Sequence, residues 1–225
     1  MNKVVDIKKA VDKIKSGDRI MVGGFGNVGC PMNLLYELSS RKEINHLTTI
    51  SEDFQMGGLD GWYQGFTEML MEDRIDEIIV SFFGHTEGNK KVAAGEVKLT
   101  LVPQGTLAER IRAAGSGVGG FYTPTGVGTI VEEGKETKII NGRKYILELP
   151  LHANVAIVKC HTADTMGNAV FAYTAQNFNT CMAMAADFVI LECEHLVQPG
   201  EIAPDAVQLP GVFVDYVVHA EEVHY

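Results

Sequence analysis

The sequence has no unbroken apolar segment of the length that a membrane-spanning helix requires. Its two long uncharged stretches are broken by glycines and a proline in residues 113–131 and by amide side chains in residues 165–186. Near the N-terminus, apolar residues recur at spacings of three and four with lysines between them, which is typical of an amphipathic helix and not of a secretion signal. We therefore expect a cytoplasmic protein that makes no membrane contact.

Cysteine is scarce, and no Cys-x-x-Cys motif occurs among the four. The sequence therefore predicts reduced thiols and no disulfide framework. No two of the seven histidines have the i, i+4 spacing of a helical zinc site. Cys160 adjoins His161 and Cys193 lies close to His195, but neither spacing is a recognised ligand pattern. We expect no metal site.

Basic residues are outnumbered, with 19 lysines and arginines against 29 acids and a formal net charge of −10. A chain of this charge is a poor non-specific binder of nucleic acid. The 225 residues fit one domain, and no linker, repeat or low-complexity tract divides them. We expect a single domain that spans residues 1–225.

Short apolar runs alternate with helical patterns over most of the chain. Such an order predicts an α/β fold with an open, mainly parallel sheet covered by helices. The expected strands are residues 19–22, 47–51, 77–82, 97–102, 155–158, 188–191 and 212–218, and the expected helices are residues 6–15, 31–38, 62–71 and 106–113. Asn141-Gly142 between two apolar runs predicts an inserted β-hairpin.

The first of two glycine-rich loops runs from Gly24 to Gly29 and fits the pattern G-x-G-x-x-G between a strand and a helix. With Glu52 and Asp53 at the end of the next strand, this pattern leaves open a nicotinamide-dependent oxidoreductase. Pro31 delays the helix, however, and the acids lie beyond the usual spacing of about 20 residues. The alternative is a tight turn whose N–H groups suit a carboxylate, a thioester oxygen or a phosphate.

The second glycine-rich loop covers residues 115–129 and follows a helix, so it lacks the context of a dinucleotide site. A connection of this length without its own secondary structure is uncommon unless it has a function. Its glycines permit close approach of a ligand, and its aromatic side chains supply an apolar wall. The alternative is a surface loop that packs on its own aromatic residues.

Five segments together resemble the alpha subunits of family I CoA-transferases. They are residues 17–31 (GDRIMVGGFGNVGCP), 102–112 (VPQGTLAERIR), 115–128 (GSGVGGFYTPTGVG), 199–202 (PGEI) and 209–213 (LPGVF). The similarity extends from about residue 17 to residue 218, and the run GFYTPTG is its most specific part. The resemblance implies the CoA-transferase fold for this chain.

The resemblance also implies a chemistry and a partner. Enzymes of this family pair alpha with beta subunits or carry the same two halves fused in one chain. A glutamate of the beta half takes CoA from an acyl-CoA as a glutamyl-CoA thioester, which predicts ping-pong kinetics. The substrates would be an acyl-CoA and a short-chain carboxylate, with acetate, acetoacetate, propionate and butyrate all open. Such exchange needs neither ATP nor a metal, so no permanently bound cofactor is expected.

For individual residues, the resemblance implies that Gln104 donates to the acyl oxygen or to the acceptor carboxylate. The alternative is a turn glutamine bonded within its own loop. The other residues expected to bind substrate or an oxyanion are Gly24, Phe25, Gly26, Ser116, Gly119, Gly120, Phe121, Tyr122 and Thr123.

Glu52 follows Ser51 in a run that resembles the Ser-Glu-Asn-Gly segment of the beta-subunit nucleophile, but Asp53 and Phe54 break the match. We therefore expect a surface or subunit-contact carboxylate, with a nucleophilic role as the alternative. Residues 52–61 and 84–89 differ from the family pattern, which leaves the acyl specificity open. A non-catalytic module that binds acyl-CoA or a carboxylate is the third hypothesis.

Overall fold

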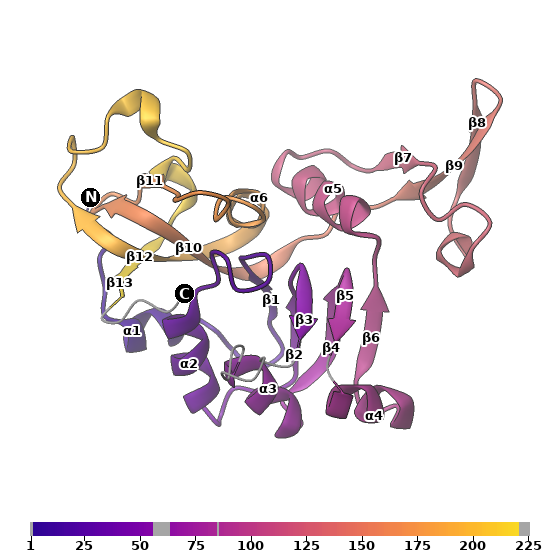
Figure 1. Cartoon of the computed structure of the whole chain (residues 1–225), viewed down its shortest axis with the longest axis horizontal. Helices are drawn as coiled ribbons and strands as arrows, with labels where there is room; N and C mark the ends of the chain where they lie inside the picture. The colour runs from indigo at the N-terminus through magenta and orange to yellow at the C-terminus, as the bar shows by residue number, and fades with distance from the viewer. Residues whose placement is uncertain (1, 56–63, 85, 221–225) are drawn as a thin grey trace.

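The computed structural model describes residues 2–55, 64–84 and 86–220 (Figure 1). The helices are α1 (Ile7–Val11), α2 (Met32–Ser40), α3 (Gln64–Met71), α4 (Thr86–Ala94), α5 (Gln104–Gly115) and α6 (Asn179–Met184). The strands are β1 (Arg19–Val22), β2 (Leu47–Ile50), β3 (Asp53–Gln55), β4 (Ile75–Val80), β5 (Phe82–Gly84), β6 (Lys98–Leu101), β7 (Phe121–Thr123), β8 (Thr137–Ile140), β9 (Arg143–Glu148), β10 (Ala153–Asp164), β11 (Ala169–Val170), β12 (Ala186–Val197) and β13 (Tyr216–His219). Short 3₁₀ turns occur at Ile130–Glu132, Pro204–Ala206 and Gly211–Phe213.

The main sheet has the strand order β13-β12-β10-β1-β2-β4-β6, with β11 paired to β10. Among the described strands of this sheet, every pairing is parallel except that of β11 with β10. Parallel neighbours require crossover connections, and helices supply most of them here. The predicted open, mainly parallel α/β sheet is confirmed.

Helices cover both faces of the sheet, so each face has its own buried core. On one face, apolar side chains of α1, α2 and α3 pack on β1, β2 and β4; Leu34, Leu35 and Phe66 are examples. On the other face, α5 and α6 pack through residues such as Leu107 and Met182. Strands buried on both sides read as continuous apolar runs, which is why the sequence located them.

Several predicted boundaries are wrong. The first helix spans only Ile7–Val11 and begins after Asp6, whose side chain accepts from the Lys9 N–H at 2.9 Å. The last strand begins at Tyr216, because Gly211–Phe213 forms a 3₁₀ turn that leaves Val212 83% exposed. Strands β10 and β12 are each 12 residues long and continue well past the runs at 155–158 and 188–191.

The predicted hairpin is confirmed and belongs to a three-stranded antiparallel sheet of order β7-β9-β8. Asn141 and Gly142 both have positive φ, 50° and 78°, as the tight two-residue turn between β8 and β9 demands. Figure 1 shows this arm beyond α5, at one end of the molecule. Arg110 of α5 holds its base, since its Nε donates to the Leu149 carbonyl at 2.9 Å.

Two short strands form a separate parallel sheet just beyond the ends of β2 and β4. Past Ile50 and Val80 the chain kinks at Glu52 and Ser81 and pairs again as β3 with β5. Phe54, fully buried on β3, stacks on Phe66 with ring centroids 5.1 Å apart. Most of the 52–61 segment and His85 of the 84–89 segment lie outside the described residues, so the two departures from the family pattern are seen only in part.

None of the described helices combines the length and the hydropathy that crossing a membrane requires.

Candidate functional site

Three polar side chains meet at the carboxyl edge of the parallel sheet. Glu52 follows β2, Ser81 follows β4, and Gln104 is the first residue of α5, after β6. The Ser81 hydroxyl donates to Glu52 Oε1 at 2.7 Å, and Gln104 Nε2 donates to the same oxygen at 3.1 Å. In open α/β sheets, ligands bind outside the carboxyl ends of the strands. This cluster therefore stands where a ligand is expected.

Glu52 is the buried member of the cluster, with only 5% of its surface exposed. Burial raises the pKa of its carboxyl, and the neighbouring Asp53 charge raises it further. The hydrogen bonds from Ser81 and Gln104 oppose this rise. Of the expected surface or subunit-contact positions, the surface one is wrong, because the β2–β3 kink turns this side chain inward beneath the exposed Gln104. A subunit contact at Glu52 stays a prediction.

The loop after β1 makes a tight reversal at the same edge. Phe25 and Val28 exchange backbone N–H···O bonds of 3.1 Å, which places Gly26 at positive φ in the turn between them. Gly29 packs so closely that an added Cβ would lie 2.7 Å from the Ala175 carbonyl oxygen. The loop glycines thus serve a turn and a close approach, and they leave the Phe25 side chain 47% exposed.

The end of α2 that a dinucleotide phosphate would need is already occupied. The buried carboxylate of Glu192, on β12, accepts from the Leu34 N–H at 3.0 Å and from Asn33 Nδ2 at 3.0 Å. A carboxylate at a helix N-terminus satisfies the N–H groups that would otherwise bind a phosphate. The G-x-G-x-x-G loop therefore lacks the anion site that a nicotinamide-dependent oxidoreductase requires.

The second glycine loop is divided between a helix cap and a strand. Val118 N–H donates to Ala113 O at 2.8 Å and Gly117 N–H to Ala114 O at 3.2 Å, with Gly117 at φ 68°. This pattern is a Schellman cap that ends α5 at the exposed Ser116. Phe121, Tyr122 and Thr123 then form β7 of the arm.

The model of the coenzyme A transferase family matches residues 4–220 of the chain. This protein belongs to the coenzyme A transferase family. One chain of a probable succinyl-CoA:3-ketoacid coenzyme A transferase from Bacillus subtilis is 44% identical over 220 residues, covering 97% of this chain and 90% of that protein. The alpha chain of an acetate CoA-transferase from Escherichia coli K12 is 38% identical over 221 residues, covering 98% of each.

Solved structures agree on the fold of this CoA-transferase subunit. An acyl-CoA transferase from E. coli O157:H7, solved as a thioester complex with CoA, superposes with a TM-score of 0.86 at 19% identity. The match covers 99% of this chain and 48% of the other, so the CoA-transferase subunit spans about half the length of that enzyme.

The CoA-transferase subunit brings some of the predicted site residues together and separates others. Gln104 meets Glu52, and Gly24, Phe25 and Gly26 follow β1, the strand that pairs with β2. Strand β7, which Gly119 and Gly120 directly precede, belongs to the arm and lies away from β1 (Figure 1). A binding role for the arm residues and for Ser116 stays a prediction.

Sequence reasoning missed two polar residues that this arrangement uses. Ser81 directly follows a buried strand, which is the same signal that pointed to Glu52. Asn179 is fully buried, and its amide accepts from Lys159 N–H at 3.0 Å and donates to Gly29 O at 3.0 Å. It ties the loop after β1 to β10, and no pattern in the sequence marks it.

One group of possible metal ligands comes together unexpectedly on β10 and β12. The ligand atoms of His161, Glu194 and His195 all lie within 4.8 Å of one another. Lys159 Nζ is 3.0 Å from Glu194 Oε1, so an ammonium already compensates this carboxylate. Nearby, burial raises the pKa of the Cys193 thiol to about 12, which keeps it protonated and poorly nucleophilic.

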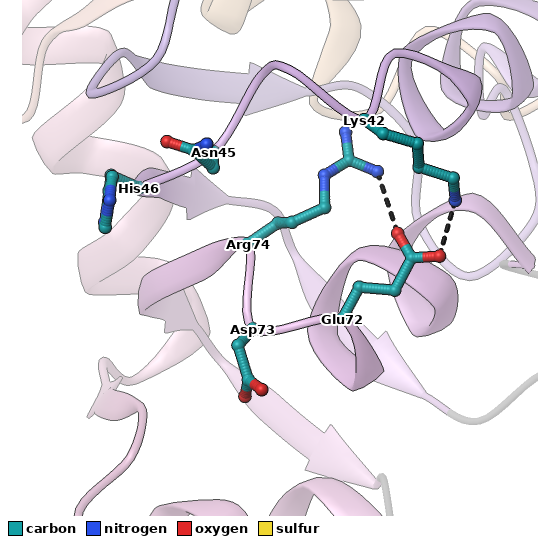
Figure 2. A pocket seen from close by; sticks show the side chains of 6 residues that line it. All are labelled: Lys42, Asn45, His46, Glu72, Asp73 and Arg74. Carbon is teal, nitrogen blue, oxygen red and sulfur yellow. Dashed lines mark hydrogen bonds and ion pairs between the residues drawn. The ribbon is translucent and has the colours of Figure 1, made fainter.

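An open polar depression lies at the opposite, amino edge of the sheet, where β2 and β4 begin. Figure 2 shows the Glu72 carboxylate between Lys42 and Arg74, which it contacts at 2.5 and 3.2 Å. Arg74 also donates to carbonyls at the end of α2, among them Ser39 O at 2.7 Å. Arg74 therefore caps the end of α2, and Glu72 and Lys42 form ion pairs beside it, which is a structural use of the depression.

Proposed function

We propose that this chain is the alpha subunit of a CoA-transferase that moves CoA from an acyl-CoA to a short-chain monocarboxylic acid. The observation that carries the proposal is Gln104, an exposed amide anchored at the carboxyl edge of the sheet by its 3.1 Å bond to buried Glu52. One amide N–H is used in that bond, and the second is available for an oxygen that gains charge during acyl exchange.

The nucleophile in this proposal is a glutamate of a beta partner. Its carboxylate attacks the thioester carbonyl and expels CoA thiolate, leaving an acyl-glutamyl anhydride. The thiolate then attacks the glutamyl carbonyl, which releases the donor acid and leaves a glutamyl-CoA thioester. The acceptor acid takes CoA by the reverse sequence. Acyl-CoA enters as a substrate, and no permanently bound cofactor is used.

Exposed apolar side chains beside the site support such a partner. Phe25 and Val28 stand on the loop after β1, and Tyr173 lies on the loop whose Asn177 donates to Val28 O at 2.8 Å. Large apolar side chains gathered on a surface mark places of protein contact. We infer a hetero-oligomer in the cytoplasm, in which the partner covers these side chains and completes the site.

The experiment compares the chain alone with the chain co-purified with its partner, using acetyl-CoA as donor and butyrate as acceptor. We expect turnover only from the pair. After incubation with acyl-CoA, borohydride reduction and mass spectrometry should locate the modified glutamate on the partner chain. Turnover by the isolated chain, or modification of Glu52, would refute the assignment of the nucleophile. Binding of acyl-CoA without turnover by the pair would favour the non-catalytic module.

A further inference from the structure

The Glu52 carboxyl is held by neutral groups. Both donors found for it, the Ser81 hydroxyl and the Gln104 amide, bond to Oε1. Among the described residues, no lysine, arginine or histidine forms an ion pair with this carboxyl, and residues 56–63, which follow β3, contain no lysine or arginine. Among the described residues, the charge that acts on its pKa is the like charge of Asp53, which raises it.

A buried carboxyl without a cation is costly. A fold normally pairs such a group with a positive charge or replaces it with an amide or an apolar residue. Two other buried acids are compensated: Lys135 Nζ lies 2.5 Å from Glu148 Oε1, and each oxygen of Glu192 accepts its own hydrogen bond, from Asn33 Nδ2 and from the Leu34 N–H. Glu52 differs from both, because its two donors among the described residues share Oε1, and it lies at the edge of the sheet where the substrate is expected.

We propose that Glu52 selects the acyl group of the substrate, and that it selects acyl chains carrying a hydrogen-bond donor, an ammonium or a hydroxyl group. This inference rests on the proposed function, because it requires the acyl chain to lie beside Gln104. Oε2 of Glu52 is the acceptor for the donor, and Ser81 and Gln104 fix its position through Oε1.

The same charge disfavours other acyl groups. A plain alkyl chain gives Oε2 no donor, so it would displace water from the carboxyl without replacing the hydrogen bonds of that water. A dicarboxylic acid brings a second anion toward Glu52 and Asp53, and like charges at contact distance repel strongly in a poorly hydrated site. The Bacillus subtilis relative is named for succinyl-CoA, and this chain should use succinate poorly.

The test uses the co-purified pair with acetyl-CoA as donor and four acceptors of four carbons each. The acceptors are 3-aminobutyrate, 3-hydroxybutyrate, butyrate and succinate. We expect kcat/KM to be higher for both donor-bearing acids than for butyrate, and lowest for succinate. Whichever of the two donor-bearing acids is faster identifies the preferred group.

Glu52→Gln removes the charge but keeps the shape and the ability to bond Ser81 and Gln104. In this variant the preference for 3-aminobutyrate over butyrate should fall by about 10- to 100-fold, the value of one hydrogen bond to a charged group. The ratio of kcat/KM for succinate to kcat/KM for butyrate should rise at least about tenfold. The exposed acid variant Glu43→Gln is the matched control and should leave all four ratios unchanged.

The possible outcomes distinguish a failure of selection by Glu52 from a failure of the proposed CoA-transferase function. Transfer to none of the four acids from acetyl-CoA, propionyl-CoA or butyryl-CoA would refute the proposed function. Transfer in which the wild type uses succinate as well as butyrate would overturn the selection by Glu52 and leave the function standing. So would a Glu52→Gln variant that slows all four acids by the same factor. Thermal unfolding of both variants identifies any loss that comes from misfolding.

Discussion

Replacing Gln104 by alanine removes the amide above the Glu52 carboxyl. If its second N–H meets an oxygen that gains negative charge, turnover should fall about 10²- to 10³-fold, or about 2.7–4 kcal/mol of transition-state stabilisation. The loss of folding stability should be smaller than this loss of transition-state stabilisation. The 3.1 Å bond to Glu52 is partly buried and Gln104 is exposed, so we expect about 1 kcal/mol of lost stability. The two effects therefore differ enough to be measured separately.

The assay is steady-state kinetics of the reconstituted pair, with Gln198→Ala as an exposed glutamine control. Loss of transition-state stabilisation lowers kcat and kcat/KM together, whereas loss of ground-state binding raises KM alone. Gln104→Glu should be at least as damaging, because it places a second carboxyl where Nε2 now lies 3.1 Å from Glu52 Oε1. Two adjacent carboxyls raise each other's pKa, so this variant should lose more activity at pH 8 than at pH 6.

Near-normal kcat in both variants would refute the reasoning. Gln104 would then have only a structural role, as the first residue of α5 that covers Glu52. A rise in KM with unchanged kcat would mean that the amide binds the acceptor equally in the ground state and in the transition state.

Three further outcomes are expected. Glu52 has a pKa raised in the fold, so it binds its proton more tightly folded than unfolded, and the stability it contributes falls as pH rises from its unfolded pKa through the raised value. In urea unfolding, Glu52→Gln should therefore gain stability relative to wild type between pH 4 and pH 7, and no pH dependence of that difference would contradict the burial argument. Gly119→Ala should keep the wild-type Tm, since nothing lies within 4 Å of an added Cβ. Gly120→Val should lower Tm, because φ is 150° and the Cβ would lie 3.0 Å from the backbone carbonyl oxygen of Glu148. Equal Tm values for the two variants would exclude this constraint. Asn179→Leu should cost about 3 kcal/mol or more in denaturant unfolding, because it leaves the buried backbone partners of the amide unsatisfied, and a cost below about 1 kcal/mol would show that the loop after β1 does not depend on it.

The positions of most strands along the chain could be predicted, because strands buried on both faces appear in the sequence as continuous apolar runs. The ends of β10 and β12 could not, since past Cys160 and Cys193 both strands continue with polar residues such as Thr162 and His195. Pairing between the two strands holds them extended where neither sequence alone predicts a strand. The pair β3 and β5 was missed for a similar reason, because three residues are too few to show a period.

The candidate site was predictable in its parts and not in its assembly. Gln104 and Glu52 each stand at the end of an apolar run, but 52 positions separate them, and only the parallel order of β2, β4 and β6 brings them together. Burial of Glu52 follows from a kink between two strands, which leaves no pattern in the sequence. The glycines at 24–29 match a dinucleotide motif, and their use in a tight turn depends on distant Asn179.

Backbone pairing continues on both sides of Glu52, and this continuity gives the site its rigidity. Ser51 N–H donates to Ile79 O at 3.2 Å and Ser81 N–H donates to Glu52 O at 2.9 Å, so two backbone hydrogen bonds bridge the kink between the β2–β4 pair and the β3–β5 pair. Glu52 and Ser81 are thereby fixed before any ligand arrives, whereas Gln104 stands on a separate helix. A carboxyl held this firmly cannot turn away from an unsuitable acyl chain. An acyl chain that gives this charge no donor therefore binds less tightly, and that difference in binding free energy is what discriminates between substrates.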